Sequence, residues 1–294
     1  MNICFITDNP GTTSHPVIGM VLQRLGLRHT VRLLDVHTLT GDAAIAQERA
    51  HPLADIYLLK SHTVQALQVA HHLERQGALV VNSWASSFAC QDRVRLAQRM
   101  KEACLPWPST WSLLPSDDAP RQRFLSTLPF PLIIKSRYSC RGDLVEKVHD
   151  VERLQALLRQ RKQVSFILQE FVPGDGSDIK LWVIGQQVFA ARRPTPLQAK
   201  GPEETLPIAP EKIPSDWGSI ALEIGPVFGL HVYGADLIMT QRGPIVVDVN
   251  SFPGFRGVAG AASALIALIE RLISCLCCSW FANDLLCAML LQQT

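Results

Sequence analysis

The most informative pattern in this chain is GADLIMTQRGPIVVDVNSFPGFRG, which spans residues 234–257. Its apolar runs and central turn predict a hairpin of two short strands, over residues 235–239 and 244–249. A three-residue loop at 241–243, with Gly243 in the left-handed conformation, would set Asp236 directly opposite Asp248. Side chains opposed in this way have Cβ atoms roughly 4.5–5.5 Å apart.

Asn250 would share a face of the hairpin with these two aspartates, because it lies two residues beyond Asp248 in an extended strand. Two carboxylates that close repel one another unless a positive charge lies between them. The three oxygen-bearing side chains therefore predict a site for a hard cation, and Mg²⁺ typically takes one or two carboxylates plus substrate phosphates. The alternative is a set of polar residues at a strand end that face water.

The composition is that of a globular protein with little charge bias. The length of 294 residues suggests about two domains, and a net charge of +2 gives no electrostatic case for binding nucleic acid or an anionic membrane. Eight cysteines without a regular framework, and no secretory signal, favour a reducing compartment, so we expect a cytoplasmic protein. No apolar run reaches the roughly 18 residues of a membrane span, so none is expected.

The first hundred residues alternate between strand and helix patterns, which favours a parallel sheet. We expect strands over residues 2–7, 31–34, 55–59 and 78–82, with helices over 17–27, 64–75 and 92–103. The glycine-rich fingerprint of dinucleotide-binding folds is absent. Lys60 and Asn82 follow strand ends, where open sheets often bind ligands, although both could be ordinary loop residues.

The middle of the chain places charged residues at strand ends. An apolar strand over 131–135 ends in Lys135 and precedes the polar loop 136–143, a combination that suits polyphosphate. A helix over 152–161, a strand over 164–172 and a hairpin over 179–192 follow. Charges bracket this hairpin at Asp178, Lys180 and the pair Arg192–Arg193, and their partner is either an anionic ligand or water.

Taken in order, these segments resemble the ATP-grasp superfamily over nearly the whole chain. The family pattern is a strand ending in Lys, Q-E-[FY]-[IV], D-I-[RK] with a later Gly, an Arg, an Asp, and [DE]-x-N-x-x-P-G. The matching residues are Lys135, Gln169, Glu170, Phe171, Val172, Asp178, Ile179, Lys180, Gly185, Arg192, Arg193, Asp236, and residues 248–254. Asp92 and Arg93 also stand where members often have Asp-Lys.

The resemblance implies an α/β protein with an ATP-grasp fold of two α+β lobes behind an N-terminal parallel-sheet domain. We expect that N-terminal domain over residues 1–88, the small ATP-grasp lobe over 89–172, and the C-terminal lobe with the Mg-ATP site over 173–274. The remaining residues, 275–294, would form an apolar, cysteine-rich tail.

The resemblance also implies a role for each matching residue. Lys135 would contact the phosphates of ATP, Gln169, Glu170, Phe171 and Val172 would meet the adenine, and Asp178 would bind the ribose. Lys180, Arg192 and Arg193 would be catalytic, with Arg193 neutralising the transferred phosphoryl group. Asp236, Asp248 and Asn250 would hold Mg²⁺ or Mn²⁺. The implied chemistry phosphorylates a carboxylate to an acyl phosphate, which an amine then attacks.

Two branches of the superfamily and one non-catalytic role compete. RimK-like ligases add an amino acid such as glutamate to a carboxylate, but the basic segment that they often carry after the central Arg is replaced here by RPTPLQAK, residues 193–200. That segment, together with residues 250–255, is similar to the inositol trisphosphate kinases, which phosphorylate an alcohol, yet the nearly neutral chain favours the ligase. An ATP-binding scaffold without activity is the third possibility.

The C-terminal residues lie outside the resemblance. A helix over 259–271 leads into an apolar stretch, and four of the eight cysteines fall in the last twenty residues, namely Cys275, Cys277, Cys278 and Cys287. Their spacing matches no common zinc site, which favours buried thiols. Such a tail could dock on a second subunit, giving a homo-oligomer, or cover the core of its own chain.

Overall fold

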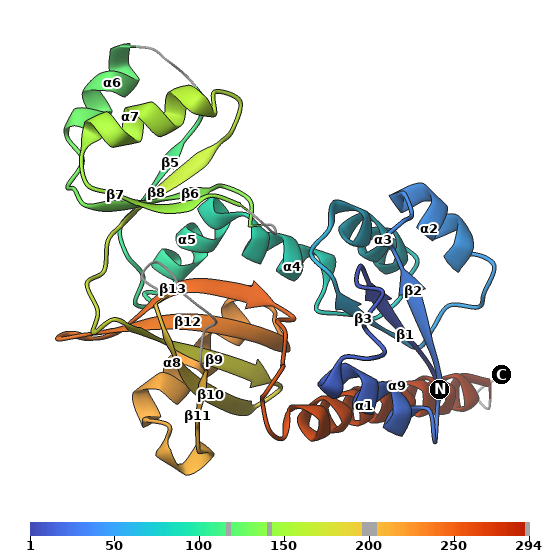
Figure 1. Cartoon of the computed structure of the whole chain (residues 1–294). Coiled ribbons are helices and arrows are strands. Elements are labelled where there is room, and N and C mark those ends of the chain that lie inside the picture. Colours follow the sequence, from blue (N-terminus) through green and yellow to red (C-terminus); the bar gives the residue numbers. More distant parts are fainter. Residues whose placement is uncertain (116–118, 140–142, 196–204, 292–294) are drawn as a thin grey trace. The chain divides into compact units, whose positions relative to one another are not determined.

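The structure is a computed structural model of the whole chain, and it describes residues 1–115, 119–139, 143–195 and 205–291 (Figure 1). The chain forms two compact units. The first comprises residues 1–83, 184–187 and 254–294, and the second comprises residues 84–183 and 188–253.

The first unit contains the predicted parallel sheet, with strand order β2-β1-β3-β4. Its strands are β1 (Asn2–Thr7), β2 (Thr30–Asp35), β3 (Ile56–Lys60) and β4 (Val80–Val81), and its helices include α1 (Pro16–Leu25), α2 (Gly41–Glu48) and α3 (Val64–Arg75). Threonine side chains cap α2 and α3, and His15 caps α1 by accepting bonds from two backbone N–H groups. The predicted fourth strand keeps only two residues in the sheet.

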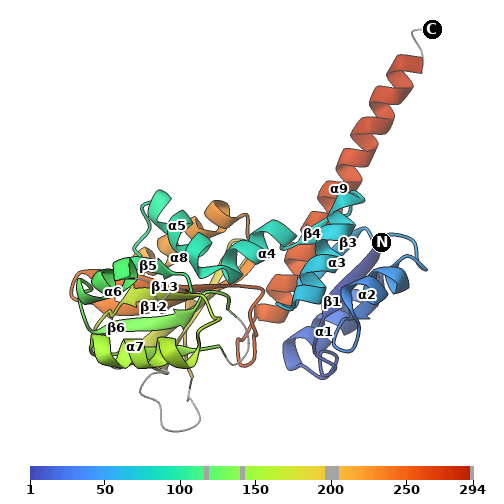
Figure 2. The ribbon, with the colours of Figure 1, turned by 90° about the horizontal axis from the view of Figure 1, so that it is seen from above.

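The helix predicted over 259–271 is longer than expected. Helix α9 (Ala261–Leu291) begins two residues later and runs without interruption into the predicted tail, because no proline or glycine follows to stop it (Figure 2). It packs against α1, and Glu270 lies 3.2 Å from the ring of His29. The prediction for the thiols at 277, 278 and 287 concerns side chains outside the described part. Among the described residues, no helix is both long and apolar enough to cross a membrane.

The second unit contains two sheets (Figure 1). A four-stranded antiparallel sheet has the order β5-β8-β6-β7, with β5 (Thr110–Leu113), β6 (Leu132–Ser136), β7 (Val145–Val148) and β8 (Phe166–Glu170). Its apolar face packs against α6 (Ala119–Ser126) and α7 (Val151–Gln160). Helix α6 begins at Ala119, and residues 116–118 before it lie outside the described part.

The second sheet of this unit has five strands in the order β11-β10-β9-β12-β13. They are β9 (Ser177–Ile184), β10 (Gln187–Pro194), β11 (Leu206–Ile208), β12 (Val232–Thr240) and β13 (Gly243–Ser251). The short 3₁₀ helix η1 (Pro210–Lys212) precedes α8 (Ser215–Phe228). The core of this sheet includes residues from α4 (Trp84–Gln91), α5 (Arg93–Glu102) and α8. The predicted middle strands and the predicted hairpin around residues 185–186 are confirmed, with ends displaced by a few residues.

The hairpin of β12 and β13 confirms the predicted pairing of Asp236 with Asp248, but by a different route. The predicted three-residue loop is wrong, because Thr240 pairs with Gly243 and the turn holds two residues. A bulge next to Asp236 then adds one residue, Val247, which the register passes over. Gly243 has a φ of +104°, a conformation that side chains rarely adopt.

Candidate active site

A cavity of about 730 Å³ lies in the second unit and is lined by residues from both of its sheets. The four-stranded sheet contributes β6, β7 and the end of β8, and the five-stranded sheet contributes β9, β10, β12 and β13. The connection from Phe171 to Gly176 lines it between the two sheets. Nine of the predicted site residues line this cavity, namely Lys135, Gln169, Glu170, Phe171, Val172, Asp178, Arg193, Asp236 and Asp248.

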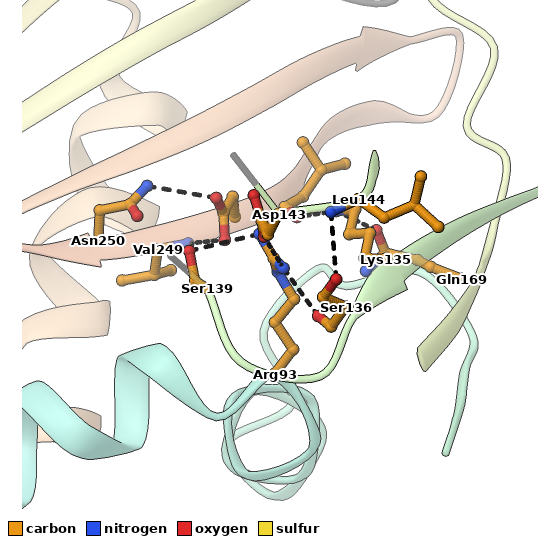
Figure 3. A network of polar contacts seen from close by, with 11 residues as sticks. Arg93, Lys135, Ser136, Ser139, Asp143, Leu144, Gln169, Val249 and Asn250 are labelled. Carbon is orange, nitrogen blue, oxygen red and sulfur yellow. Dashed lines mark hydrogen bonds and ion pairs between the residues drawn. The ribbon is translucent and has the colours of Figure 1, made fainter. Parts of the chain in front are cut away.

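Lys135 extends from β6 and is held by oxygen atoms of both sheets (Figure 3). Its Nζ donates to Gln169 Oε1 at 2.8 Å and to the carbonyl oxygen of Val247 at 3.0 Å. That carbonyl belongs to Val247, the extra residue of the bulge, which has no partner residue on β12. The bulge therefore leaves this carbonyl oxygen available to Lys135. Burial lowers the pKa of Lys135, and the Asp248 carboxylate only partly offsets this effect.

Asp236 lies between two cationic side chains. Lys180 Nζ on β9 is 2.6 Å from Asp236 Oδ1, and an Nη atom of Arg193 on β10 is 3.2 Å from Oδ2. Burial alone would raise the pKa of Asp236, but Lys180 and Arg193 more than offset burial, and the pKa lies below its usual range. The carboxylate is therefore ionised and already neutralised by neighbours on its own sheet.

Asp248 and Asn250 lie together at the end of β13, as the alternation of strand side chains predicts. Asn250 Nδ2 donates to Asp248 Oδ2 at 3.3 Å, and the backbone N–H of Val249 donates to Asp248 Oδ1 at 3.1 Å. Within the described residues, no group of three or more His, Cys, Asp or Glu side chains could hold a metal ion. Two opposed carboxylates and an amide oxygen nevertheless suit Mg²⁺, which usually completes its shell with phosphates and water.

The remaining cofactor residues sit where the two sheets are connected. Asp178 on β9 is 5% exposed and accepts a bond of 2.8 Å from Thr195 Oγ1. The carboxylate of Glu170 accepts from the backbone N–H of Ser109 at 3.4 Å. Lys147 on β7 covers one face of the Phe171 ring, with Nζ 3.5 Å from the ring centroid.

Arg192 is the predicted catalytic residue that the fold sets apart from the others. It precedes Arg193 in the same strand, so the two side chains leave opposite faces. Its exposed side chain donates to Asp175 Oδ2 at 3.0 Å and to Ser177 Oγ at 2.9 Å. The segment after it cannot be compared with the prediction, because residues 196–204 lie outside the described part.

Sequence reasoning assigned no role in the site to Arg93, a buried residue of the cavity (Figure 3). An Nη atom of Arg93 donates to the carbonyl of Ser136 at 2.8 Å and to the Asp143 carboxylate, and the other Nη donates to Ser139 Oγ at 3.4 Å. Asp92 beside it accepts two bonds from Arg137, at 3.0 and 2.7 Å. The Asp92–Arg93 match to the family pattern was the signal available. Residues 140–142 of the predicted polyphosphate loop lie outside the described part.

The sequence matches the family model of the RimK-like ATP-grasp domain over residues 90–273. The chain belongs to this family. Among curated relatives, a protein named probable alpha-L-glutamate ligase from Legionella pneumophila (strain Corby) is 25% identical over 277 residues, which cover 88% of this chain and 90% of the relative.

Two solved structures show that the fold is the one expected of the RimK-like family. A RimK domain ATP-grasp protein from Sphaerobacter thermophilus has a TM-score of 0.70 and 20% identity, covering 92% of this chain and all of that one. D-alanine–D-alanine ligase from Bacillus anthracis, in complex with ATP, has a TM-score of 0.71 and 16% identity, covering 93% and 96%. The predictions of an ATP-grasp fold and of a RimK-like ligase family are confirmed, while the roles of single residues stay predictions.

Proposed function

We propose that this RimK-like protein joins a carboxylate to an amine at the expense of ATP. The observation that carries the proposal is the convergence, in one cavity, of Lys135 and Arg193 with the opposed carboxylates of Asp236 and Asp248. Cations that can bind a triphosphate thus lie beside oxygen ligands that can bind a divalent metal. Family membership and the glutamate ligase relative favour an amino acid as the amine.

In this proposal the reaction passes through an acyl phosphate. A carboxylate oxygen of the acceptor attacks the γ-phosphorus of ATP, and ADP leaves with the electrons of the broken bond. The amine then attacks the acyl carbon, inorganic phosphate leaves, and the amine loses a proton, so that an amide remains. The protein would orient the reactants and stabilise the developing charge, because phosphoryl transfer requires little covalent chemistry from side chains.

Side chains of both sheets would share the binding of the nucleotide. Lys135 would bind phosphate oxygens, Asp178 would accept a ribose hydroxyl, and Gln169, Glu170, Phe171 and Val172 would surround the adenine. Arg193 would offset the charge on the transferred phosphoryl group, with Lys180 beside it. Arg192, exposed and bound to Asp175, would support this site only indirectly.

A divalent cation would be held by Asp236, Asp248 and Asn250. Mg²⁺ or Mn²⁺ in this place would neutralise charge on the β- and γ-phosphates and help to orient them. The donor set fits such an ion, because it offers oxygen atoms only and leaves room in the shell for phosphate. The cytoplasmic location and a homo-oligomeric state remain proposals drawn from the sequence.

The proposal is tested by ADP release from the purified full-length protein. ATP and Mg²⁺ are supplied with pools of carboxylates, pools of amino acids, both together, or inositol polyphosphates. We expect ADP only where a carboxylate and an amine are both present. ADP formed with inositol phosphates alone would show a kinase instead, and nucleotide binding without turnover in any pool would show a scaffold.

The Asp248→Ala variant serves as the control for contaminating activity in this screen. We expect it to lose Mg²⁺-dependent turnover, because the opposed carboxylate pair is broken, while its circular dichroism spectrum matches that of the wild type. A variant with near-normal turnover would refute the metal role of Asp248.

A further inference from the structure

The ion pairs around Asp236 raise a question that the proposed function does not answer. Asp236 would be a metal ligand, yet both of its carboxylate oxygens already lie within 3.2 Å of a cationic side chain. The three side chains are only 12–20% exposed. They come from three strands that are neighbours in the sheet, β10, β9 and β12, so the backbone fixes their spacing.

The charges close to the carboxylate pair oppose the entry of a free dication. Lys180 and Arg193 both form ion pairs with Asp236, and Lys135 lies close enough to Asp236 to act on its charge as well. Adding a divalent ion alone would place more positive charge in a poorly solvated site, which is unfavourable. A nucleotide triphosphate brings several negative charges, which offer Lys180 and Arg193 new partners and so release Asp236.

We propose that Lys180 and Arg193 are resident counterions of Asp236, which keep the carboxylate pair closed to free divalent cations until the phosphates of a nucleotide draw them away. This inference rests on the proposed nucleotide and metal site and adds an order of binding to it. Lys180 is then a positioning residue, which acts on the reaction through the state of Asp236. The protein then binds the metal weakly in the absence of nucleotide. Nucleotide binding raises the affinity for the metal, which is positive coupling.

The coupling can be measured by equilibrium dialysis of Mn²⁺ against the full-length protein. The β,γ-methylene analogue of ATP is either absent or present at equal concentration in both chambers, so that the excess metal in the protein chamber is the protein-bound fraction. For the wild type we expect weak Mn²⁺ retention without the analogue and at least about tenfold tighter retention with it, within the usual range for coupled sites.

Two substitutions of Lys180 distinguish the effect of its charge from the effect of its shape. Lys180→Met removes the ammonium group that pairs with Asp236 Oδ1 and leaves this oxygen without its cation. Retention of Mn²⁺ without nucleotide should therefore tighten by about tenfold or more. Lys180→Arg keeps the charge and should behave as the wild type. Lys147→Met is the matched control, because that lysine lines the same cavity but lies over the Phe171 ring, and it should leave retention without nucleotide unchanged.

The outcomes separate this inference from the proposed function. Tight Mn²⁺ retention by the wild type without nucleotide, or unchanged retention in a folded Lys180→Met variant, would overturn the counterion role while leaving the metal site intact. Absence of Mn²⁺ retention even with the analogue would overturn the proposed metal site itself. Should Lys180→Met fail to fold, Lys180→Gln takes its place, and tight Mn²⁺ retention by the wild type without nucleotide would still overturn the counterion role.

Discussion

At the scale of single residues, Lys135 carries its charge where burial opposes it. Its ammonium group is shielded from water and held by an amide oxygen and a backbone carbonyl, and its pKa is lowered. A buried charge that lowers stability is usually kept because the function depends on it. Binding a polyphosphate is a function that depends on such a charge. The residue is therefore expected to serve binding more than folding.

We predict that Lys135→Met weakens binding of the ATP analogue by about tenfold or more, since a charge-assisted hydrogen bond contributes about 1.5–3 kcal/mol. The melting temperature should change little, because the substitution removes two hydrogen bonds of Lys135 together with the cost of burying its charge, the cost that lowers its pKa. Calorimetric titration and thermal unfolding measure the two effects. Lys162→Met, at an exposed position after α7, is the control. Unchanged affinity, or a clear loss of thermal stability, would contradict this account of Lys135.

Motif residues could be placed from the sequence because their chemical types and order are specific, but their surroundings could not. The doublet of Arg192 and Arg193 does not reveal which side chain faces the cavity, since that depends on the register of β10 within the sheet. Likewise, the contact of Lys180 with Asp236 joins neighbouring strands far apart in sequence. No local pattern encodes such a contact.

At the scale of elements, the β12–β13 hairpin shows two routes to the same pairing. A three-residue turn, and a two-residue turn followed by a bulge, both set Asp236 opposite Asp248. The sequence does not distinguish the three-residue turn from the two-residue turn with a bulge, because Gly243 is compatible with both. Only the second route leaves Val247 outside the register, where its carbonyl oxygen can accept a bond from Lys135.

We predict that Gly243→Ala destabilises the protein by about 1 kcal/mol or more, because its φ of +104° strains any residue with a Cβ atom. Gly218→Ala is the matched control. Gly218 lies inside α8, where an added Cβ meets nothing within 4 Å, so this change should stabilise by about 0.5–1 kcal/mol. Denaturant midpoints measure both changes. Equal effects of the two substitutions would show that the turn does not depend on a glycine.

At the scale of the whole molecule, the fold class could be predicted while several elements could not. The parallel sheet of the first unit and the ATP-grasp sheets of the second follow from strand patterns and from motif order. Strands β5 and β7 hold four residues each, too few for a reliable alternation, and β5 pairs with residues 166–169, far along the chain. Helix α9 was predicted too short because its apolar continuation carries little helical periodicity.

The central claim for the whole molecule is ligation through an acyl phosphate, and the path of the carboxylate oxygen tests it most directly. The acceptor pool is labelled with ¹⁸O in its carboxyl groups, turnover is run with ATP, Mg²⁺ and amino acids, and the released phosphate is analysed by mass spectrometry. We predict one ¹⁸O atom in each phosphate formed, because the carboxylate oxygen that attacks phosphorus leaves with it. Amide formation with unlabelled phosphate would contradict the account.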